Sequence, residues 1–210
     1  MRRSEVQFLS PAPGHQHYQA EGSVTDSLQV DTASGLIMPA RFVVSPNHDA
    51  RPDVDDISVL IIHAISLPPC EHGGPYVEQL FCNELDHDAH PYFKEIEGLE
   101  VSSHLFIRRN GELIQFVPFT ERAWHAGQSC CQGRERVNDF SIGIELEGDD
   151  ESAFEDVQYE VLARVTRALL AAYPALNRDH IYGHAEISPG RKTDPGPHFD
   201  WPRYRSLFEA

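Results

Sequence analysis

The sequence predicts an α/β fold in one domain over residues 35–210, and three observations support this. The run from Ile57 to Ile65 is β-branched and apolar at odd and even positions, which is typical of a central strand covered on both faces. Further strand-like segments follow it, and a long segment with helical apolar spacing lies after residue 150. Strands that alternate with helices along one chain indicate an α/β domain.

Composition excludes several classes of protein. With 33 acidic and 17 basic side chains the formal charge is −16, which argues against a nucleic-acid partner. No window approaches the ~20 apolar residues of a membrane-spanning helix, and no signal peptide is recognisable. The four cysteines lack C-x-x-C spacing and are interpreted as reduced thiols of a cytoplasmic protein. Residues 1–34 show no sustained period and predict a flexible extension.

The middle of the chain predicts one helix and a hairpin. A helix is expected over residues 75–85, after the turn that Pro68 and Pro69 impose. Residues 103–108 and 112–117 read as two strands around Asn110 and Gly111, a strong hairpin signal.

The last third of the chain predicts a strand, a long helix and two shorter elements. Residues 139–146 alternate between isoleucine-type and small or charged side chains, as a strand does. Ser152 and Glu155 form a capping-box pattern before a helix over residues 153–172. A short strand is expected near Ile181, and a C-terminal helix is expected to start near Asp200.

His63 is the histidine whose position is unusual. The chain has twelve histidines, so the presence of one near a feature is weak evidence by itself. His63 interrupts the most apolar segment, near the carboxyl end of the expected central strand. An unpartnered buried imidazole would cost ~1–3 kcal/mol there. His63 is therefore either a core histidine bonded to a backbone carbonyl or a functional residue.

A loop near the C-terminus holds His184 and Asp194, ten positions apart. Prolines and glycines punctuate this loop and restrict its conformations. Two imidazoles and one carboxylate can give a divalent metal three ligands and leave a fourth position for water, the usual layout of a catalytic zinc site. By itself the spacing of this pair is a weak signal that also arises by chance.

Glu145 and Lys192 are the candidate catalytic side chains. Glu145 lies on the face of its strand opposite the isoleucines, and its apolar neighbours favour the raised pKa that a general base needs. Glu147 shares that face, and a solvated carboxylate is the alternative. Lys192 is one of only two lysines and lies two residues from Asp194, where an ammonium could stabilise an oxyanion. A surface lysine is the ordinary alternative.

Several short motifs carry a resemblance to a known family. They stand in one order at residues 61–69, 73–75, 123–127, 133–136, 138–148 and 192–196. Together they resemble the AmpD-type N-acetylmuramoyl-L-alanine amidase family, cytoplasmic zinc hydrolases of cell-wall recycling. The family is related to phage lysozyme-type amidases and to peptidoglycan recognition proteins. The resemblance extends from about residue 35 to residue 208.

The resemblance implies a mixed central β-sheet with helices packed around it and a zinc site near the strand ends. It implies the zinc ligands His63, His184 and Asp194 and the catalytic residues Glu145 and Lys192. The implied substrate is a 1,6-anhydro-N-acetylmuramyl peptide, cut at the amide between the lactyl group and L-alanine.

Substrate-binding residues follow from the same motifs. Arg136 is a candidate for a stem-peptide carboxylate, and Trp124 and His125 are candidates for the cleft wall, although Trp124 can equally be a core residue. Ala64 stands where close relatives commonly have asparagine, and Glu100 where relatives can carry a basic residue. We expect a monomer that acts on small anhydro-muropeptides, without nucleic-acid or membrane partners.

Two alternatives belong to other functional classes. A non-catalytic muropeptide-binding module could share the fold, although a pure binder has no need of an open metal site. Two histidines and a carboxylate also describe a non-haem iron oxygenase triad, which would require oxygen for turnover.

Overall fold

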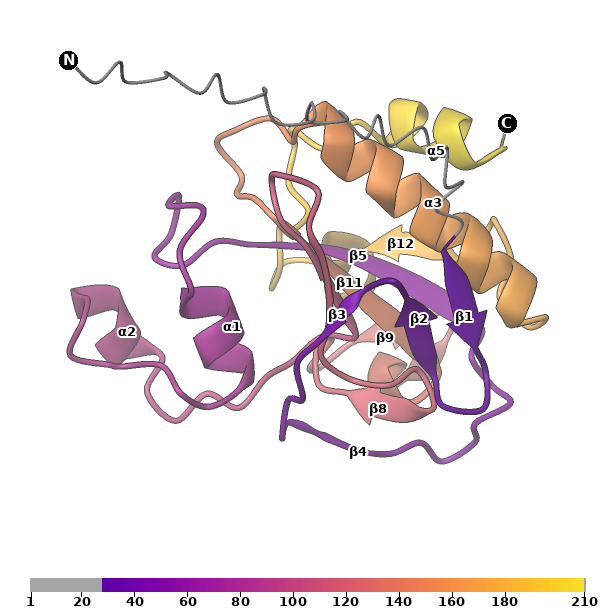
Figure 1. The fold of residues 1–210 in the computed structure, drawn as a ribbon, viewed down its shortest axis with the longest axis horizontal. Helices are drawn as coiled ribbons and strands as arrows, with labels where there is room; N and C mark the ends of the chain where they lie inside the picture. Colours follow the sequence, from indigo (N-terminus) through magenta and orange to yellow (C-terminus); the bar gives the residue numbers. More distant parts are fainter. Residues whose placement is uncertain (1–27, 210) are drawn as a thin grey trace, which may run out of the picture.

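A six-stranded mixed sheet organises residues 28–209, the part of the chain that this computed structural model describes (Figure 1). Its strand order is β12-β5-β11-β6-β7-β3. The bounds are β3 Arg41–Phe42, β5 Val59–Ile65, β6 Leu105–Ile107, β7 Leu113–Gln115, β11 Ser141–Glu147 and β12 Ile181–Gly183. The predicted α/β class and mixed sheet are confirmed.

The centre of the sheet is parallel. β11 pairs in parallel with β5 on one side and β6 on the other, and β12 pairs in parallel with β5. β6 and β7 form the predicted antiparallel hairpin. Its turn depends on Gly111, which has a φ of +84° and donates its N–H to the Arg108 carbonyl at 2.9 Å. Every residue of β11 is buried, so both faces of this central strand are covered.

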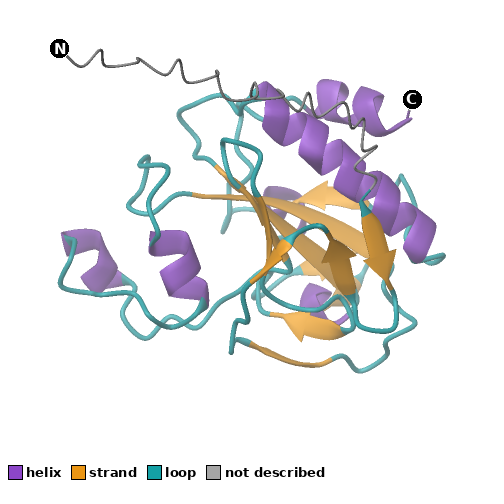
Figure 2. Cartoon of the chain, in the orientation of Figure 1, coloured by secondary structure: helices purple, strands orange, loops and turns teal. Residues whose placement is uncertain are grey.

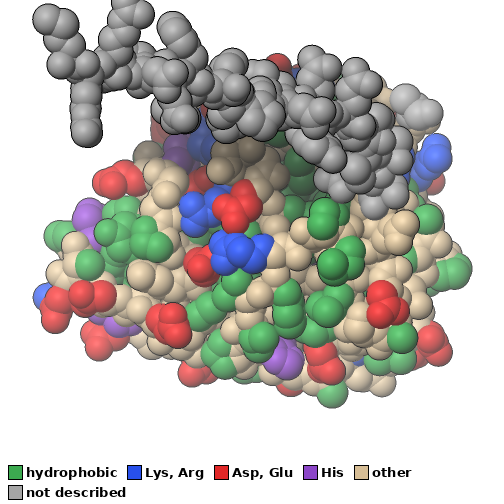
Figure 3. All heavy atoms as spheres, viewed as in Figure 1, with side chains coloured by type: hydrophobic (Ala, Val, Ile, Leu, Met, Phe, Trp, Pro, Cys, Tyr) green, Lys and Arg blue, Asp and Glu red, His purple; other side chains and the backbone are tan. Residues whose placement is uncertain are grey.

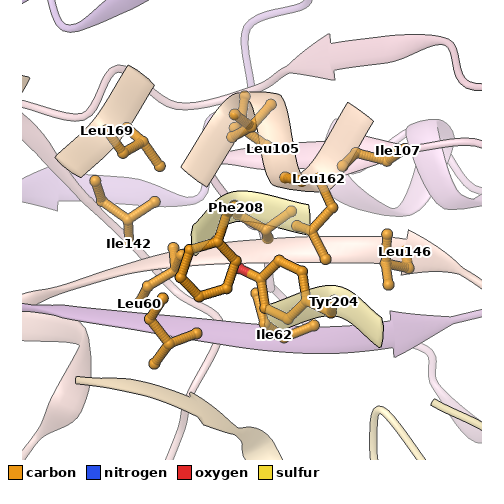
Figure 4. Close-up of a cluster of buried hydrophobic side chains, with 14 of the residues drawn as sticks. Leu60, Ile62, Leu105, Ile107, Ile142, Leu146, Leu162, Leu169, Tyr204 and Phe208 are labelled. Atoms are coloured by element: carbon orange, nitrogen blue, oxygen red, sulfur yellow. The ribbon is translucent and has the colours of Figure 1, made fainter. Parts of the chain in front are cut away.

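Two helices cover one face of the sheet (Figure 2). α3, Asp156–Ala172, packs against α5, Trp201–Glu209. Figure 4 shows how side chains from both helices meet those of the strands. The main apolar cluster includes Leu60, Ile62, Leu105, Ile107, Ile142, Ile144, Leu146, Leu162, Leu169, Tyr204 and Phe208. The Tyr204 hydroxyl lies 2.6 Å from that of Thr166, so the buried phenol has a polar partner.

Shorter elements surround this core. α1, Tyr76–Phe81, and α2, Pro91–Glu95, stand apart from α3 and α5 in Figure 1 and supply a second apolar cluster that includes Leu80, Phe81 and Phe93. α4, His184–Ile187, directly follows β12, and a 3-10 helix spans Val137–Asp139. Three two-stranded ladders complete the described fold: β1 Gln29–Asp31 with β2 Leu36–Met38, β4 His48–Ala50 with β8 Glu121–Ala123, and β9 Cys130–Cys131 with β10 Arg134–Glu135.

Several predicted boundaries differ from the structure. β1 lies inside the segment expected to be a flexible extension, and Val30 of β1 and the preceding Leu28 pack on the main core. Residues 1–27 of that extension lie outside the described residues. α3 begins at Asp156, because the capping box uses Glu155 as its N-cap in place of Ser152, and the Gln158 side chain accepts the Glu155 N–H at 3.0 Å. The helix expected over residues 75–85 ends at Phe81.

The surface is mixed in charge. Figure 3 shows acidic, basic and hydrophobic side chains interspersed on one face. Among the described residues, no helix has the length and apolar character needed to cross a membrane. The four cysteines, Cys70, Cys82, Cys130 and Cys131, are free thiols.

Leu162 tests the packing of α3 on the sheet. Its side chain is fully buried in the main apolar cluster, so Leu162→Ala should lower the free energy of unfolding by about 2–5 kcal/mol. The exposed Glu160 on the same helix is the matched control, and Glu160→Ala should change stability by less than about 0.5 kcal/mol. Urea unfolding measures both, and equal effects would contradict this description of the core.

Candidate functional site

Three neighbouring parallel strands bring polar side chains to one edge of the sheet. His63 is in β5, and its register partner in β11 is Glu145. His184 comes directly after β12 and is the first residue of α4. Because parallel strands end at the same edge, these side chains meet although they are far apart in the sequence.

Asp194 joins the two histidines in a tight cluster. His63 Nδ1 lies 3.0 Å from His184 Nδ1 and 3.0 Å from Asp194 Oδ2, and His184 Nδ1 lies 3.1 Å from that same oxygen. Both imidazoles are buried and Asp194 is partly buried. This is the group that could hold a metal ion, with one donor atom from each residue and all donor atoms within 4.8 Å of one another.

The loop that carries Asp194 is held by backbone hydrogen bonds. The Asp194 carbonyl accepts the Ala185 N–H at 2.9 Å, which ties the loop to the start of α4. The Ser188 carbonyl accepts the N–H groups of Arg191 and Lys192 at 3.1 and 3.2 Å. These bonds fix a segment that has neither helix nor strand beneath Asp194.

Burial and charge set the ionisation of the cluster. Burial, the largest effect, lowers the pKa of His63 to about 4, so its imidazole is neutral at pH 7. Burial alone would raise the pKa of Asp194, but hydrogen bonds with His184 and His63 outweigh it and hold that pKa well below its usual value. A neutral imidazole beside an ionised carboxylate is the protonation state in which these groups bind metals.

Each imidazole also has a partner at its other nitrogen. His184 Nε2 lies 3.1 Å from the Ala126 carbonyl oxygen, and His63 Nε2 lies 2.9 Å from Nδ1 of His125. Histidines that bind metals usually donate their second N–H in this way. The chemistry of the donor set therefore fits a divalent metal.

The structure distinguishes Glu145 from Glu147, the two carboxylates that share one face of the predicted strand. Glu147 accepts the N–H of Gly73 at 2.6 Å and that of Arg109 at 3.0 Å, so both of its oxygens are engaged by loop amides. Glu145 is equally buried, but its Oε2 has no hydrogen-bond partner among the described residues. Burial first, and the charge of Asp194 second, raise the pKa of Glu145 well above its usual value, while Lys192 opposes this shift.

A cavity of about 210 Å³ opens onto these groups. Glu145, Lys192 and Asp194 contribute to its polar end, together with His125 and His184. The rest of its wall is largely apolar and comes from the α1 and α2 region, with Leu67, Leu80, Phe81, Tyr92, Ile96 and Leu99. Such a cavity pairs a few convergent polar groups with an apolar wall, as small-molecule sites do.

Comparisons with known proteins identify the family. The family model described as N-acetylmuramoyl-L-alanine amidase matches residues 53–197. The 1,6-anhydro-N-acetylmuramyl-L-alanine amidase AmpD of Salmonella typhimurium is 59% identical over 173 residues, which cover 82% of this chain and 92% of that protein. The chain belongs to the N-acetylmuramoyl-L-alanine amidase family.

Solved structures agree with this membership. A crystal structure of a selenomethionine derivative of AmpD is 56% identical and superposes with a TM-score of 0.81, covering 85% of this chain and 98% of that one. The amidase AmiD from Escherichia coli is 29% identical, with a TM-score of 0.53, and covers 86% of this chain and 65% of that one. That structure is a complex with the substrate anhydro-N-acetylmuramic acid-L-Ala-D-gamma-Glu-L-Lys.

The substrate-binding candidates of this amidase-family chain fall in different places. Trp124 is half-buried directly after β8, and its indole nitrogen lies 3.3 Å from Asp49 Oδ1. Arg136 is largely exposed, pairs with Asp139 at 3.2 Å, and lines a separate cavity of about 430 Å³. His125 is buried, lies within hydrogen-bond distance of His63 and lines the cleft. Among these three candidates, only His125 contributes to the cavity that holds Glu145.

Sequence reasoning missed the apolar wall of the cleft. α2 spans five residues, too few for a helical period to be visible in the sequence. Its start does carry a local signal, since Pro91 follows His90 and the His90 side chain accepts the Tyr92 N–H. The packing of α1 and α2 beside the cleft is a tertiary feature without such a signal.

The pH dependence of stability tests the environment of Glu145. Because its pKa is raised in the folded state, Glu145 stabilises the fold while its carboxyl is protonated, and this contribution is lost as the pH rises through the folded-state pKa. Glu145→Gln stays neutral at every pH. The metal-free variant should therefore gain stability relative to wild type as the pH is raised from about 4 to about 8, by ~1–3 kcal/mol.

Urea unfolding of the metal-free proteins across this pH range makes the measurement, with the exposed Glu160→Gln as control. A stability difference between Glu145→Gln and wild type that does not change with pH would contradict the assigned environment.

Proposed function

We propose that this protein is a zinc-dependent N-acetylmuramoyl-L-alanine amidase of peptidoglycan recycling. Its substrate is a 1,6-anhydro-N-acetylmuramyl peptide, and it hydrolyses the amide that joins the lactyl group of the sugar to L-alanine. The observation that carries the proposal is the register of Glu145 opposite His63, which sets an unpaired buried carboxylate beside the His63, His184 and Asp194 cluster.

The relatives support the substrate class. The AmpD of Salmonella typhimurium is named for the 1,6-anhydro-N-acetylmuramyl-L-alanine bond, and AmiD was solved with an anhydro-muropeptide. A sugar joined to a short peptide presents both polar and apolar groups. The cleft of this chain offers both kinds of surface, with Lys192 and Glu145 at one end and Leu99 and Tyr92 along its wall.

The ligand set supports zinc as the metal. His63, His184 and Asp194 would hold the ion, because three donor atoms about 3 Å apart can all lie ~2.0–2.2 Å from one centre. A zinc ion held there would supply a Lewis acid for the scissile carbonyl and would lower the pKa of a bound water molecule toward ~7.

Glu145 acts as the general base and then as the general acid. Its carboxylate takes a proton from the attacking water while the water oxygen bonds to the lactyl carbonyl carbon. The carbon–nitrogen bond then breaks, and Glu145 returns the proton to the leaving alanine nitrogen. A raised pKa suits both halves of this task near neutral pH.

Lys192 stabilises the negative charge that develops on the carbonyl oxygen. Its side chain lines the cleft beside Glu145 and Asp194 and is exposed. No hydrogen bond or ion pair engages its ammonium group within residues 28–209, so it is available to the substrate. Removal of a donor of this kind typically costs ~10²–10³ in turnover.

We also propose that the enzyme acts in the cytoplasm, where recycled cell-wall fragments are processed. Separately, we propose that it acts as a monomer.

A chelator experiment tests the reaction and the metal together. Purified protein incubated with an anhydro-muropeptide should release the intact stem peptide and anhydro-N-acetylmuramic acid, detected by mass spectrometry. A strong chelator should abolish this release, and added zinc should restore it. Tight binding of the muropeptide to zinc-loaded protein without cleavage would instead identify a non-catalytic recognition module.

Two substitutions separate the metal ligands from the general base. Glu145→Ala should retain zinc and lower turnover by ~10²–10⁴-fold, since it removes the proton carrier alone. Asp194→Ala should lose zinc as well as activity, because it removes one of three ligands. Zinc content is measured by atomic absorption after gel filtration. Loss of zinc in Glu145→Ala would instead make Glu145 a ligand or a structural residue.

A further inference from the structure

His125 lies between the cluster and the interior of the fold. Its Nδ1 is 2.9 Å from His63 Nε2, and its Nε2 is 3.1 Å from the Ser141 hydroxyl oxygen. The side chain is 9% exposed, and its ring meets that of His63 edge-on, with ring centroids 5.0 Å apart. Both ring nitrogens of His125 are therefore used inside the protein.

A metal held by His63 Nδ1 would fix the direction of every proton in this row. Nδ1 faces His184 and Asp194, and a metal bound there takes its lone pair, so the proton of the neutral ring is on Nε2. His63 Nε2 then donates to His125 Nδ1, and His125 Nε2 donates to Ser141 Oγ. With these two tautomers, every ring nitrogen of His63 and His125 has a partner of the matching kind.

The fold is shaped to hold the His125 ring in this place. Gly143 of β11 lies against it, and a Cβ added to Gly143 would be 2.5 Å from the ring, too close for any other residue. The side-chain oxygen of Asn138 accepts the N–H groups of His125 and Ala126, at 3.3 and 2.8 Å. The ring thus has contacts on several sides, and rotation would break them.

The same short segment serves both histidines of the cluster. Ala126, the residue after His125, supplies the carbonyl that faces His184 Nε2. Residues 125 and 126 together therefore orient both imidazoles, one through a side chain and one through the backbone.

We propose that His125 is a positioning residue that holds His63 in its metal-binding tautomer and orientation. This role goes beyond the cleft-wall role that the sequence suggested for His125, and it rests on the proposed zinc site. Its partner is a neutral imidazole, where a carboxylate or a carbonyl is the usual choice. His125 therefore orients His63 without adding negative charge near Glu145, whose burial already disfavours its ionised form.

The test measures zinc affinity rather than activity. His125→Phe keeps an aromatic ring of similar size and removes the acceptor, and it should weaken zinc binding by ~10–100-fold in a competition titration with a chromophoric chelator. His125→Asn, whose side-chain oxygen lies near the position of Nδ1, should recover part of the affinity. His48→Phe, which removes a partly exposed histidine of β4, should bind zinc like wild type.

A second, smaller substitution tests the same role in case His125→Phe does not fold. Ser141→Ala leaves the His125 ring in place and removes only the acceptor at its far side, so it should weaken zinc binding by a smaller factor. Circular dichroism of each metal-free variant verifies its fold.

The outcomes distinguish this proposal from the proposed function. Wild-type zinc affinity in both His125→Phe and Ser141→Ala would overturn the positioning role, and a raised KM alone in His125→Phe would return His125 to the cleft wall. Failure of the wild-type chain to bind zinc would overturn the metal site itself.

Discussion

The parallel register between β5 and β11 is the constraint on which the site depends. It places Glu145 opposite His63 at the centre of a sheet that is covered on both faces. A shift of β11 by one residue would turn Glu145 to the other face and bring an apolar neighbour, Ile144 or Leu146, into the cleft. The apolar cluster under α3 and α5 prevents this shift, because Ile62 and Ile144 are anchored in it. The hydrophobic core therefore determines the geometry of the polar site.

The same constraint explains the distribution of polar groups in the interior. Most buried polar side chains near the site are fully bonded, as Glu147 and His125 illustrate. Glu145 differs, because its Oε2 has no hydrogen-bond partner among the described residues, and the desolvation of that oxygen is unfavourable to the fold. A group that exchanges protons with a substrate needs a free lone pair. Where a buried carboxyl has this function, the free lone pair lowers the stability of the fold.

The sequence was sufficient where a signal is local and strong. The apolar run around Ile61 predicted the central strand, Gly111 predicted the hairpin, and a set of motifs in one order predicted the family. Strands of two or three residues, such as β4 and β9, have no visible period, and they were missed. The order of the sheet and the cleft wall depend on contacts between distant segments. The position of His125 likewise depends on the absence of a side chain at Gly143, eighteen residues away.

The wide spacing of the cluster along the chain also bears on protein synthesis. His63 and His184 are separated by 121 positions, and His63 and Asp194 by 131. The three side chains can therefore meet only after a growing chain has been synthesised past residue 194. A polypeptide that ends before residue 184 would lack His184, Asp194 and α5, and with α5 it would lose Tyr204 and Phe208 from the main apolar cluster. Such a product would hold His63 without the two partners that complete the cluster.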